Sequence, residues 1–208
     1  MAGSDSFTVH PPRLRTGMRI SQGLAGEVHT VRDAIAVAHP IARREVESAR
    51  ACSVVAMVEA KSRAVVSITV GFMAYRRRLL GGARLWQGFV ATNNRTRQTK
   101  LVASGEFGPE QFAQLSARPG SEFPPEPLDA EAVVLDVPDV LRLAAERLAL
   151  KGAAFQSDEP VQLVLRNKGG RHEWHLTHEA HHGFGAYVLV VDARRREITF
   201  EQSSPDDG

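Results

Sequence analysis

The sequence has little of what marks several specialised classes of protein. Its one cysteine, Cys52, cannot form a disulfide within the chain, and its apolar neighbours indicate a buried, inert thiol. Aromatic residues make up 6% of the chain. The longest apolar run, near residues 64–75, is too short and interrupted to span a bilayer, and the first residues lack the apolar segment of a secretory signal. We therefore expect a cytoplasmic protein with no membrane partner.

The chain also lacks a large excess of charge. Its formal net charge is +2 at pH 7, because basic and acidic residues nearly balance. Scattered arginines on a nearly neutral chain are a weak electrostatic signal, so a nucleic-acid partner is not expected. Hydrophobic residues make up 43% of the sequence and charged residues 24%, which is the composition of an ordinary globular protein.

The beginning of the chain predicts an arm and then a helix. Residues 1–26 have little periodicity, so we expect a flexible arm with one short strand near Met18–Ile20. Apolar residues then recur at helical spacing, which predicts a helix over residues 30–50. Pro40 lies inside this helix and should kink or split it, because proline lacks the amide donor and its ring crowds the preceding turn.

Two predicted hairpins follow this helix. Two apolar runs flank residues 61–63, and two more flank Asn93 and Asn94, which is turn chemistry suited to hairpins. Within the second run, apolar residues alternate with small polar ones, so one face of the strand should be buried. The residues expected on that buried face are Val66, Ile68, Val70 and Phe72. The first half thus predicts a helix followed by four antiparallel strands.

The second half repeats this order after a break. Residues 109–118 predict a short helix, and the proline-rich, acidic residues 118–135 are the best candidate for a linker. Asp136 is a cap candidate for a helix that stops at Gly152. Four further strands are predicted from apolar runs at 161–167, 171–179, 186–193 and 197–202. Residues 203–208 are expected to be disordered.

The shared order of the two halves predicts an α+β fold. We expect two pseudo-repeated units, residues 27–117 and 136–202, each a helix packed on a four-stranded antiparallel meander. A single continuous sheet with both helices on one face is equally compatible with the sequence.

The second unit carries a recognisable pattern. A helix precedes a strand with a tryptophan, Trp174, and a closing hairpin that reads AYVLVVDARRREI over residues 186–198. This order over about residues 138–202 resembles a PepSY-like unit, a small cystatin-like α+β domain. Residues 194–196, all arginine, stand where that family has a Thr-Gly turn. Such domains are usually exported or membrane-associated and are thought to bind or inhibit peptidases, so the resemblance implies a binding scaffold without catalysis.

A histidine-rich segment offers the sharpest chemical motif. His178 and His182, with Glu179, satisfy the H-E-x-x-H pattern in which two histidines one helical turn apart bind zinc and the glutamate activates a water. A metal-dependent hydrolase is therefore one alternative, and it requires a helix over residues 177–183. The preceding residues predict a strand instead, on which His178 and His182 would lie roughly 13 Å apart. Two weaker hypotheses are adventitious zinc binding and pH sensing by the clustered imidazoles.

Two tryptophans and a run of arginines are candidates for a binding surface. Trp86 and Trp174 each fall in an alternating strand, which favours packing in the sheet over stacking against a ligand. Arg76, Arg77 and Arg78, like the arginines at 194–196, lie beside a predicted turn, where solvated charge is the simpler interpretation and a phosphate or acidic-partner site is the alternative.

The sequence contains no phosphate-binding loop, dinucleotide fingerprint or nucleophile elbow. We therefore expect a non-enzymatic protein without a cofactor, whose sheet surfaces bind a protein partner or a second copy of the chain. A third alternative is a cone-shaped α+β fold that encloses a small apolar ligand.

Overall fold

The structure is a computed structural model that describes residues 15–16, 21–77, 83–117, 123–155, 160–178 and 187–203. The strands are β1 (Arg15–Thr16), β2 (Ser21–Gly23), β3 (Arg50–Glu59), β4 (Val65–Arg77), β5 (Ala83–Asn93), β6 (Gln98–Phe107), β7 (Pro160–Lys168), β8 (Arg171–His178), β9 (Tyr187–Asp192) and β10 (Ile198–Ser203). The helices are α1 (Val31–Glu45), α2 (Pro109–Ser116) and α3 (Val137–Leu150), with a 3-10 turn η1 at Ala130–Ala132.

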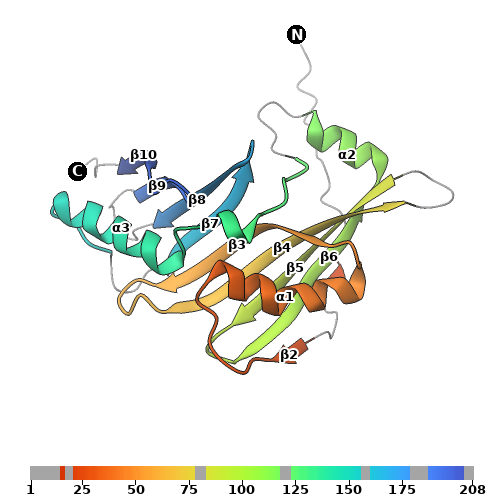
Figure 1. The fold of residues 1–208 in the computed structure, drawn as a ribbon, viewed down its shortest axis with the longest axis horizontal. Helices are drawn as coiled ribbons and strands as arrows, with labels where there is room; N and C mark the ends of the chain where they lie inside the picture. The colour runs from red at the N-terminus through yellow and green to blue at the C-terminus, as the bar shows by residue number, and fades with distance from the viewer. Residues whose placement is uncertain are drawn as a thin grey trace, which may run out of the picture.

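One antiparallel sheet contains all of these strands. Its ten strands run in the order β1-β6-β5-β4-β3-β7-β8-β9-β10, and β2 also pairs with β6 (Figure 1). The α+β class and the antiparallel sheet predicted from the sequence are confirmed. The two halves of the chain meet where β3 pairs with β7, from Ser53 opposite Arg166 to Glu59 opposite Pro160. The sheet is therefore continuous, which is one of the two arrangements that the sequence left open.

Helix α1 forms as predicted but is shorter. Its N-cap is Thr30, whose side chain accepts a hydrogen bond from the Asp33 amide. The helix ends at Glu45, because Val46 is extended and the chain then turns into β3 at Arg50. Pro40 does not split the helix, contrary to one of the two outcomes predicted for it. Pro40 is exposed, so water can satisfy the carbonyl that the proline leaves without an amide donor.

Helix α3 confirms the predicted helix entry at Asp136. The Asp136 carboxylate accepts the amide of Val137, and the Asp139 side chain accepts the amide of Asp136 in return. The Asp136 carboxylate also accepts the amide of Val31, the first residue of α1, at 3.0 Å. One side chain therefore caps both helices, and the beginnings of α1 and α3 meet at this carboxylate.

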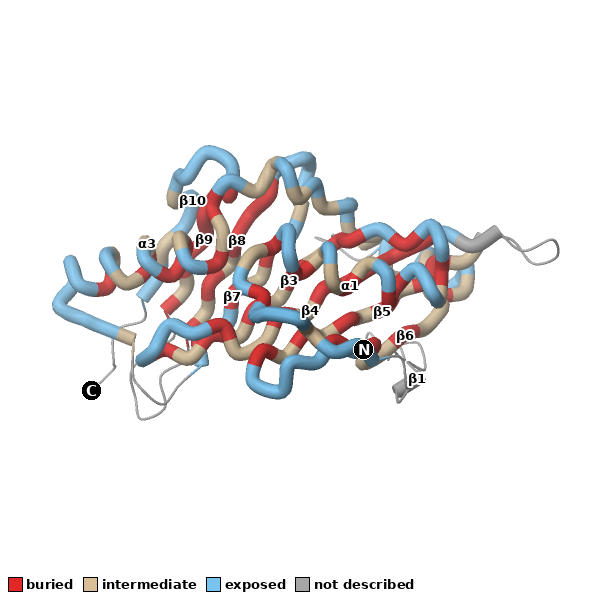
Figure 2. The backbone as a smooth tube through the Cα atoms, turned by 60° about the horizontal axis from the view of Figure 1, so that its bottom comes forward, coloured by how far each residue is buried: buried red, intermediate tan, exposed pale blue. Residues whose placement is uncertain are grey.

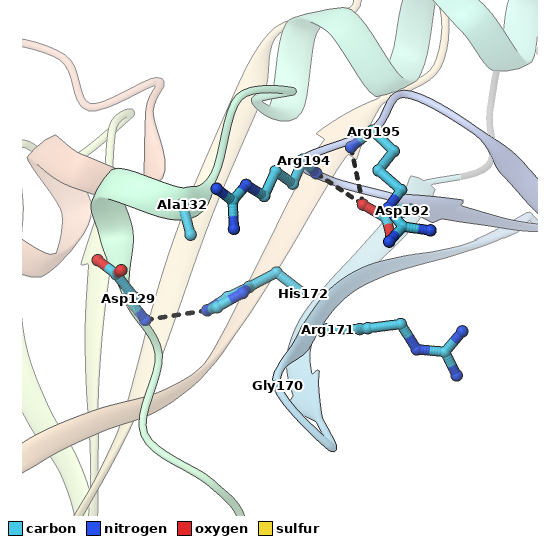
Figure 3. A pocket seen from close by; sticks show the side chains of 8 residues that line it. All are labelled: Asp129, Ala132, Gly170, Arg171, His172, Asp192, Arg194 and Arg195. Atoms are coloured by element: carbon cyan, nitrogen blue, oxygen red, sulfur yellow. Dashed lines mark hydrogen bonds between the residues drawn. The ribbon is translucent and has the colours of Figure 1, made fainter.

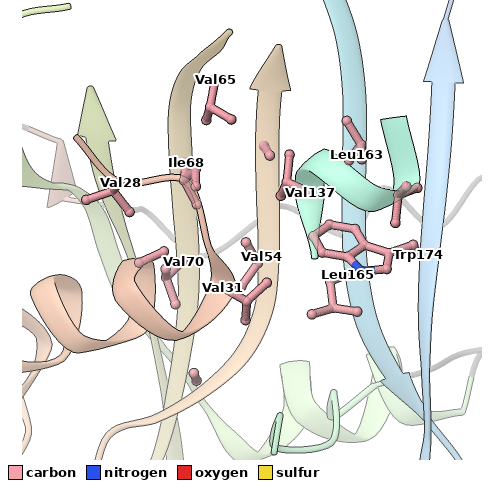
Figure 4. Packing of buried hydrophobic residues seen from close by; sticks show 14 of the residues in the cluster. Val28, Val31, Val54, Val65, Ile68, Val70, Val137, Leu163, Leu165 and Trp174 are labelled. Carbon is pink, nitrogen blue, oxygen red and sulfur yellow. The ribbon is translucent and has the colours of Figure 1, made fainter. Parts of the chain in front are cut away.

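Both helices lie on the same face of the sheet. A single apolar cluster contains the inward side chains of α1 and α3 together with those of β3, β4, β7, β8 and β9 (Figure 4). Val54, Leu165 and Trp174 are each 0% exposed in this cluster. Along β3 from Ser53, and along β7 as far as Arg166, buried residues alternate with more exposed ones, as the period of two requires (Figure 2). Burial on the scale of this cluster is the main force that holds the helices to the sheet.

Helix α2 packs on the opposite face, at one corner. Met73, Leu85 and Phe107 form a second apolar cluster with Cys52, and Phe112 and Leu115 of α2 pack against it. In β4, Met73 alternates with Phe72 and Ala74, which belong to the main core. Since successive side chains of a strand point to opposite faces, α2 and α1 lie on opposite sides of the sheet.

Residues 123–135, which the composition marks as a linker, are packed against the sheet along their length. The Leu128 amide donates to the Ala51 carbonyl, and the Leu135 amide donates to the Ala193 carbonyl. The indole of Trp174 donates to the Leu135 carbonyl at 2.8 Å. The segment thus reaches from β3 to the end of β9. The predicted strand near Met18–Ile20 lies outside the described residues, which include β1 before it and resume with β2 at Ser21.

Candidate functional site

The histidine segment is only partly described by the structure. Thr177 and His178 belong to strand β8, where they pair with Val188 and Tyr187. The helix over residues 177–183 that the hydrolase alternative requires is therefore absent at these two residues. His178 is 4% exposed, and its ring meets the ring of Phe155 edge to face at 5.2 Å. Glu179 and His182 lie outside the described residues. Within the described part of the chain, no group of three or more His, Cys, Asp or Glu side chains is arranged to hold a metal.

The three described histidines of this segment do not gather in one place. His172 and His178 lie on the helix-covered face of β8 about 20 Å apart along the strand, whereas His175 lies on the other face. His172 is 6% exposed, and its Nε2 accepts the Asp129 amide at 3.0 Å. Burial lowers the pKa of His172 below its ordinary value, so its imidazole is neutral at pH 7 with the proton on Nδ1.

The two tryptophans are both in the core. Trp86 is 2% exposed and Trp174 is 0% exposed, so neither presents its ring to a partner. The Trp86 ring lies across Gly88, where a β-carbon would come within 2.4 Å of it. The alternation in the sequence favoured packing for these residues, and their burial agrees with it. The sequence also made both tryptophans candidates for a binding surface. Their burial does not fit that assignment, because a ring that stacks against a ligand must be accessible.

The arginine run lies at the end of a strand. Arg76 and Arg77 are the last residues of β4, where their backbones pair with Arg84 and Ala83 of β5. Their side chains, and the whole of Arg78, are outside what the structure describes. The assignment of these three arginines to a binding surface therefore stays a prediction.

The most extensive candidate surface is the sheet face opposite α1 and α3. Apart from α2 at its corner, no helix in the described part of the chain covers this face. Pairing places side chains of seven strands on it in register. We call this surface the open face and define it by Ser53, Val55, Met57, Ser67, Thr69, Gly71, Phe89, Ala91, Asn93, Gln162, Val164, Arg166, Glu173, His175, Thr177, Val188, Val190 and Phe200.

The open face is apolar at its centre and polar around it. Val55 of β3 stands directly opposite Val164 of β7. The neighbour of Val55 on the other side is Thr69 of β4, and Val164 is followed by His175 and then Val190. Val55 and Val164 are partly exposed, whereas Val54 on the covered face is 0% exposed. Exposed polar side chains of β7, among them Gln162 and Arg166, border the valines. At the edge of this face Phe200 of β10 is 49% exposed.

A second candidate lies at one end of the sheet, between two turns. The turn that joins β7 to β8 and the turn that joins β9 to β10 border a pocket of ≈ 480 Å³, which we call the turn pocket (Figure 3). Side chains of both signs line it, and the residues are Asp129, Ala132, Gly170, Arg171, His172, Asp192, Arg194 and Arg195.

Backbone hydrogen bonds fix the walls of the turn pocket. The Asp192 carboxylate accepts the amides of Arg194 and Arg195 at 2.9 and 2.8 Å, which holds the turn in shape. Burial alone would raise the pKa of Asp192, but these two amides and the nearby guanidinium groups of Arg195 and Arg171 outweigh it and hold the pKa below its ordinary value. Asp192 is therefore charged at pH 7.

A ligand enclosed between helices and sheet, the third alternative from the sequence, stays a prediction. The core between them is packed by side chains at 0% exposure, such as Ala38, Ile68 and Leu163. The turn pocket and a smaller pocket of ≈ 320 Å³ beside Arg50 and Tyr75 open at the surface instead.

Sequence reasoning predicted binding by the sheet surfaces without identifying the residues of the open face, and it missed the turn pocket. The open face depends on the β3–β7 pairing, which joins residues more than a hundred positions apart. The turn pocket depends on Asp129 lying beside His172, which no local pattern contains. The arginines at 194–196 were visible as a run beside a turn, and they were the one local signal for the pocket.

Comparison with known proteins adds no relative. No protein-family model matches the chain, and neither the curated proteins nor the solved structures contain a match to it. None of the helices in the described ranges combines the length and the apolar character needed to cross a membrane.

Proposed function

We propose that this chain is a non-enzymatic binding protein whose open face receives the surface of another protein, either a partner or a second copy of the chain. The observation that carries the proposal is the contrast between the two faces of the sheet. One face is covered by α1 and α3, and its central valines, Val54 and Val161, are 0% exposed. On the other face Val55 and Val164 are partly exposed. Contiguous exposed apolar surface is costly in water and is typical of interaction sites.

The composition of the open face supports a protein as its ligand. Protein interfaces have an apolar centre and a polar rim, and the open face has valines at its centre with Gln162, Arg166 and Thr177 beside them. A sheet is also a rigid platform, so little conformational entropy is lost when a partner docks. Phe89 reinforces this platform, because its ring packs across Gly71 of the neighbouring strand.

The arrangement of the chain supports two related units within the one sheet. α1 is followed by the meander β3–β6, and α3 is followed by the meander β7–β10. We propose that each is a cystatin-like unit, the second of them PepSY-like, and that the two are joined edge to edge through β3 and β7. The binding surface would then extend across both units. Cys52 is buried and forms no disulfide, which supports the cytoplasmic location that we propose.

A double substitution at the centre of the open face tests the function. Val55→Glu with Val164→Glu places two charges where the apolar contact would form, while both side chains can still reach water. The matched control is Arg142→Glu on the exposed side of α3, which changes the net charge by the same two units away from the open face. Circular dichroism and thermal unfolding establish that each variant is folded.

Sedimentation velocity measures self-association, and quantitative affinity capture followed by calorimetry with the purified interactor measures partner binding. We expect an association that the control variant retains and the valine variant loses by at least roughly tenfold. The proposal is contradicted if the wild type is monomeric at high concentration and the valine variant also captures every protein that the wild type captures.

A further inference from the structure

We propose that the turn pocket binds the phosphate group of a small phosphorylated molecule. The pocket lies at the end of the sheet, away from the centre of the open face, so this inference is independent of the protein-binding function. Its volume of ≈ 480 Å³ is within the usual range of small-molecule sites, and it exceeds what a single phosphate fills. Three of its eight lining residues are arginines, contributed by two different turns.

The carboxylates of the pocket are already engaged by backbone amides. Asp192 accepts two amides of its own turn, and Asp129 accepts the Glu131 amide at 3.0 Å. Their charges remain, so the lining carries three positive and two negative charges, a net charge of one positive with His172 neutral. Recognition in this pocket therefore depends on directed hydrogen bonds from guanidinium groups more than on a long-range field.

The guanidinium groups of Arg194 and Arg171 have fewer close polar contacts than the carboxylates of the pocket. Among the described residues, no carboxylate lies within ion-pair distance of Arg194, and Figure 3 shows its side chain beside His172 with the guanidinium toward Ala132. Arg171 is 60% exposed, and its closest acidic contact, Glu173, is 3.8 Å away, which is longer than a hydrogen bond. Both side chains can therefore turn toward an anion in the pocket without breaking a close pair.

The chemistry of these donors favours phosphate. A guanidinium presents a planar fork of N–H donors that matches two oxygens of a phosphate, and two such forks from different turns can hold a tetrahedral anion between them. His172 contributes a fixed wall, since its Nε2 is occupied by the Asp129 amide. A cation is disfavoured here, because the three guanidinium groups of the lining outnumber its two carboxylates.

Isothermal titration calorimetry at low salt tests the site with inorganic phosphate, glucose 6-phosphate and citrate as probes. The first variant is Arg194→Ala with Arg195→Ala. Because Asp192 bonds to the backbone amides of these residues and not to their side chains, the turn should keep its shape. The matched control is Arg63→Ala with Arg97→Ala, which removes the same charge from the turns at the opposite end of the sheet.

We expect glucose 6-phosphate to bind at least as tightly as phosphate, and citrate to bind more weakly. The Arg194/Arg195 variant should lose affinity for both phosphates by roughly tenfold or more, the lysine version of the same variant should lose less, and the control should bind as the wild type does. The inference is overturned if the wild type binds neither phosphate, if the control loses as much affinity as the Arg194/Arg195 variant, or if citrate binds more tightly than both phosphates.

Discussion

At the residue scale, single buried polar side chains form hydrogen bonds with backbone groups that are distant along the chain. Asn94 is the clearest case, because it lies in the β5–β6 turn and is only 7% exposed. Its Oδ1 accepts the Val28 amide, and its Nδ2 donates to the carbonyls of Val28 and Val65. The sequence predicted a turn at Asn93 and Asn94, but not that the second asparagine would tie the segment before α1 to β4.

Replacing Asn94 by alanine should therefore lower the free energy of unfolding by about 2–4 kcal/mol. The change leaves one buried amide and two carbonyls without their partners, and each such loss costs on the order of 1 kcal/mol or more. Urea unfolding measures the difference. Asn93→Ala is the control, because the Asn93 side chain only accepts the exposed Thr96 amide and should cost under about 1 kcal/mol. Equal losses in the two variants would contradict the role given to Asn94.

A second residue-scale feature is the thiol of Cys52. It is 1% exposed, and burial raises its pKa to about 12. The Sγ donates to the Gly71 carbonyl. The apolar neighbours of Cys52 in the sequence predicted this burial correctly, because they belong to a strand whose two faces are both covered at that point by apolar side chains.

At the scale of elements, the two long helices depend on one shared cap. The beginning of α1 was predicted from helical spacing and that of α3 from its cap residue, but the convergence of both on Asp136 was not predicted. The Asp136 carboxylate brings the positive ends of two helix dipoles together and satisfies one amide of each. It is also the place where the first helix of the chain is attached to the segment that leads into the second half.

Asp136→Ala should lower the free energy of unfolding by about 2 kcal/mol, because one cap is lost from each of two helices at about 1 kcal/mol each. Thr30→Ala is the matched control. It removes a cap from α1 alone and should cost about half as much. Denaturant unfolding at pH 7 measures the stability of both variants. The shared cap is refuted if Asp136→Ala is as stable as Thr30→Ala or more stable.

The same carboxyl predicts a pH dependence. Burial raises the pKa of Asp136 above its ordinary 3.8 and outweighs its amide partners, with the nearby carboxylates of Asp139 and Asp33 adding to the increase. The folded state therefore holds this proton more tightly than the unfolded chain does. Its contribution to stability is present below pH 3.8 and is lost as the pH rises through the folded pKa. The Asp136→Asn variant has no titratable group at this position. Its free energy of unfolding, relative to that of the wild type, should therefore increase from pH 3.5 to pH 7.

At the scale of the whole molecule, one sheet and one core join the two halves. The β3–β7 pairing extends over seven residue pairs, and the main apolar cluster contains side chains of both α1 and α3. The composition of residues 118–135 predicted a linker between separate units. The described part of this segment, residues 123–135, is instead bound to strands of both halves, so the two halves cannot separate without breaking buried contacts.

The two halves should consequently unfold together. Each contains one of the chain's two tryptophans, Trp86 and Trp174, so Trp86→Phe and Trp174→Phe each leave a single fluorescent probe in one half. Within each variant, the midpoint by fluorescence should equal the midpoint by far-ultraviolet circular dichroism in urea. The comparison is made within a variant, since the two substitutions destabilise to different extents. Separate midpoints would show that the halves unfold independently.

The sequence by itself determined the elements of this protein. Alternating and helical patterns, the cap at Asp136 and the turn residues are local signals, so they predicted the α+β class, the antiparallel strands and most element boundaries. Only the tertiary structure decided that β3 pairs with β7, that α1 and α3 cover the same sheet face, and that Asp129, His172 and Arg194 border one pocket. Such contacts join residues distant along the chain, and they are chosen by the total burial and hydrogen bonding of the whole fold rather than by any local pattern.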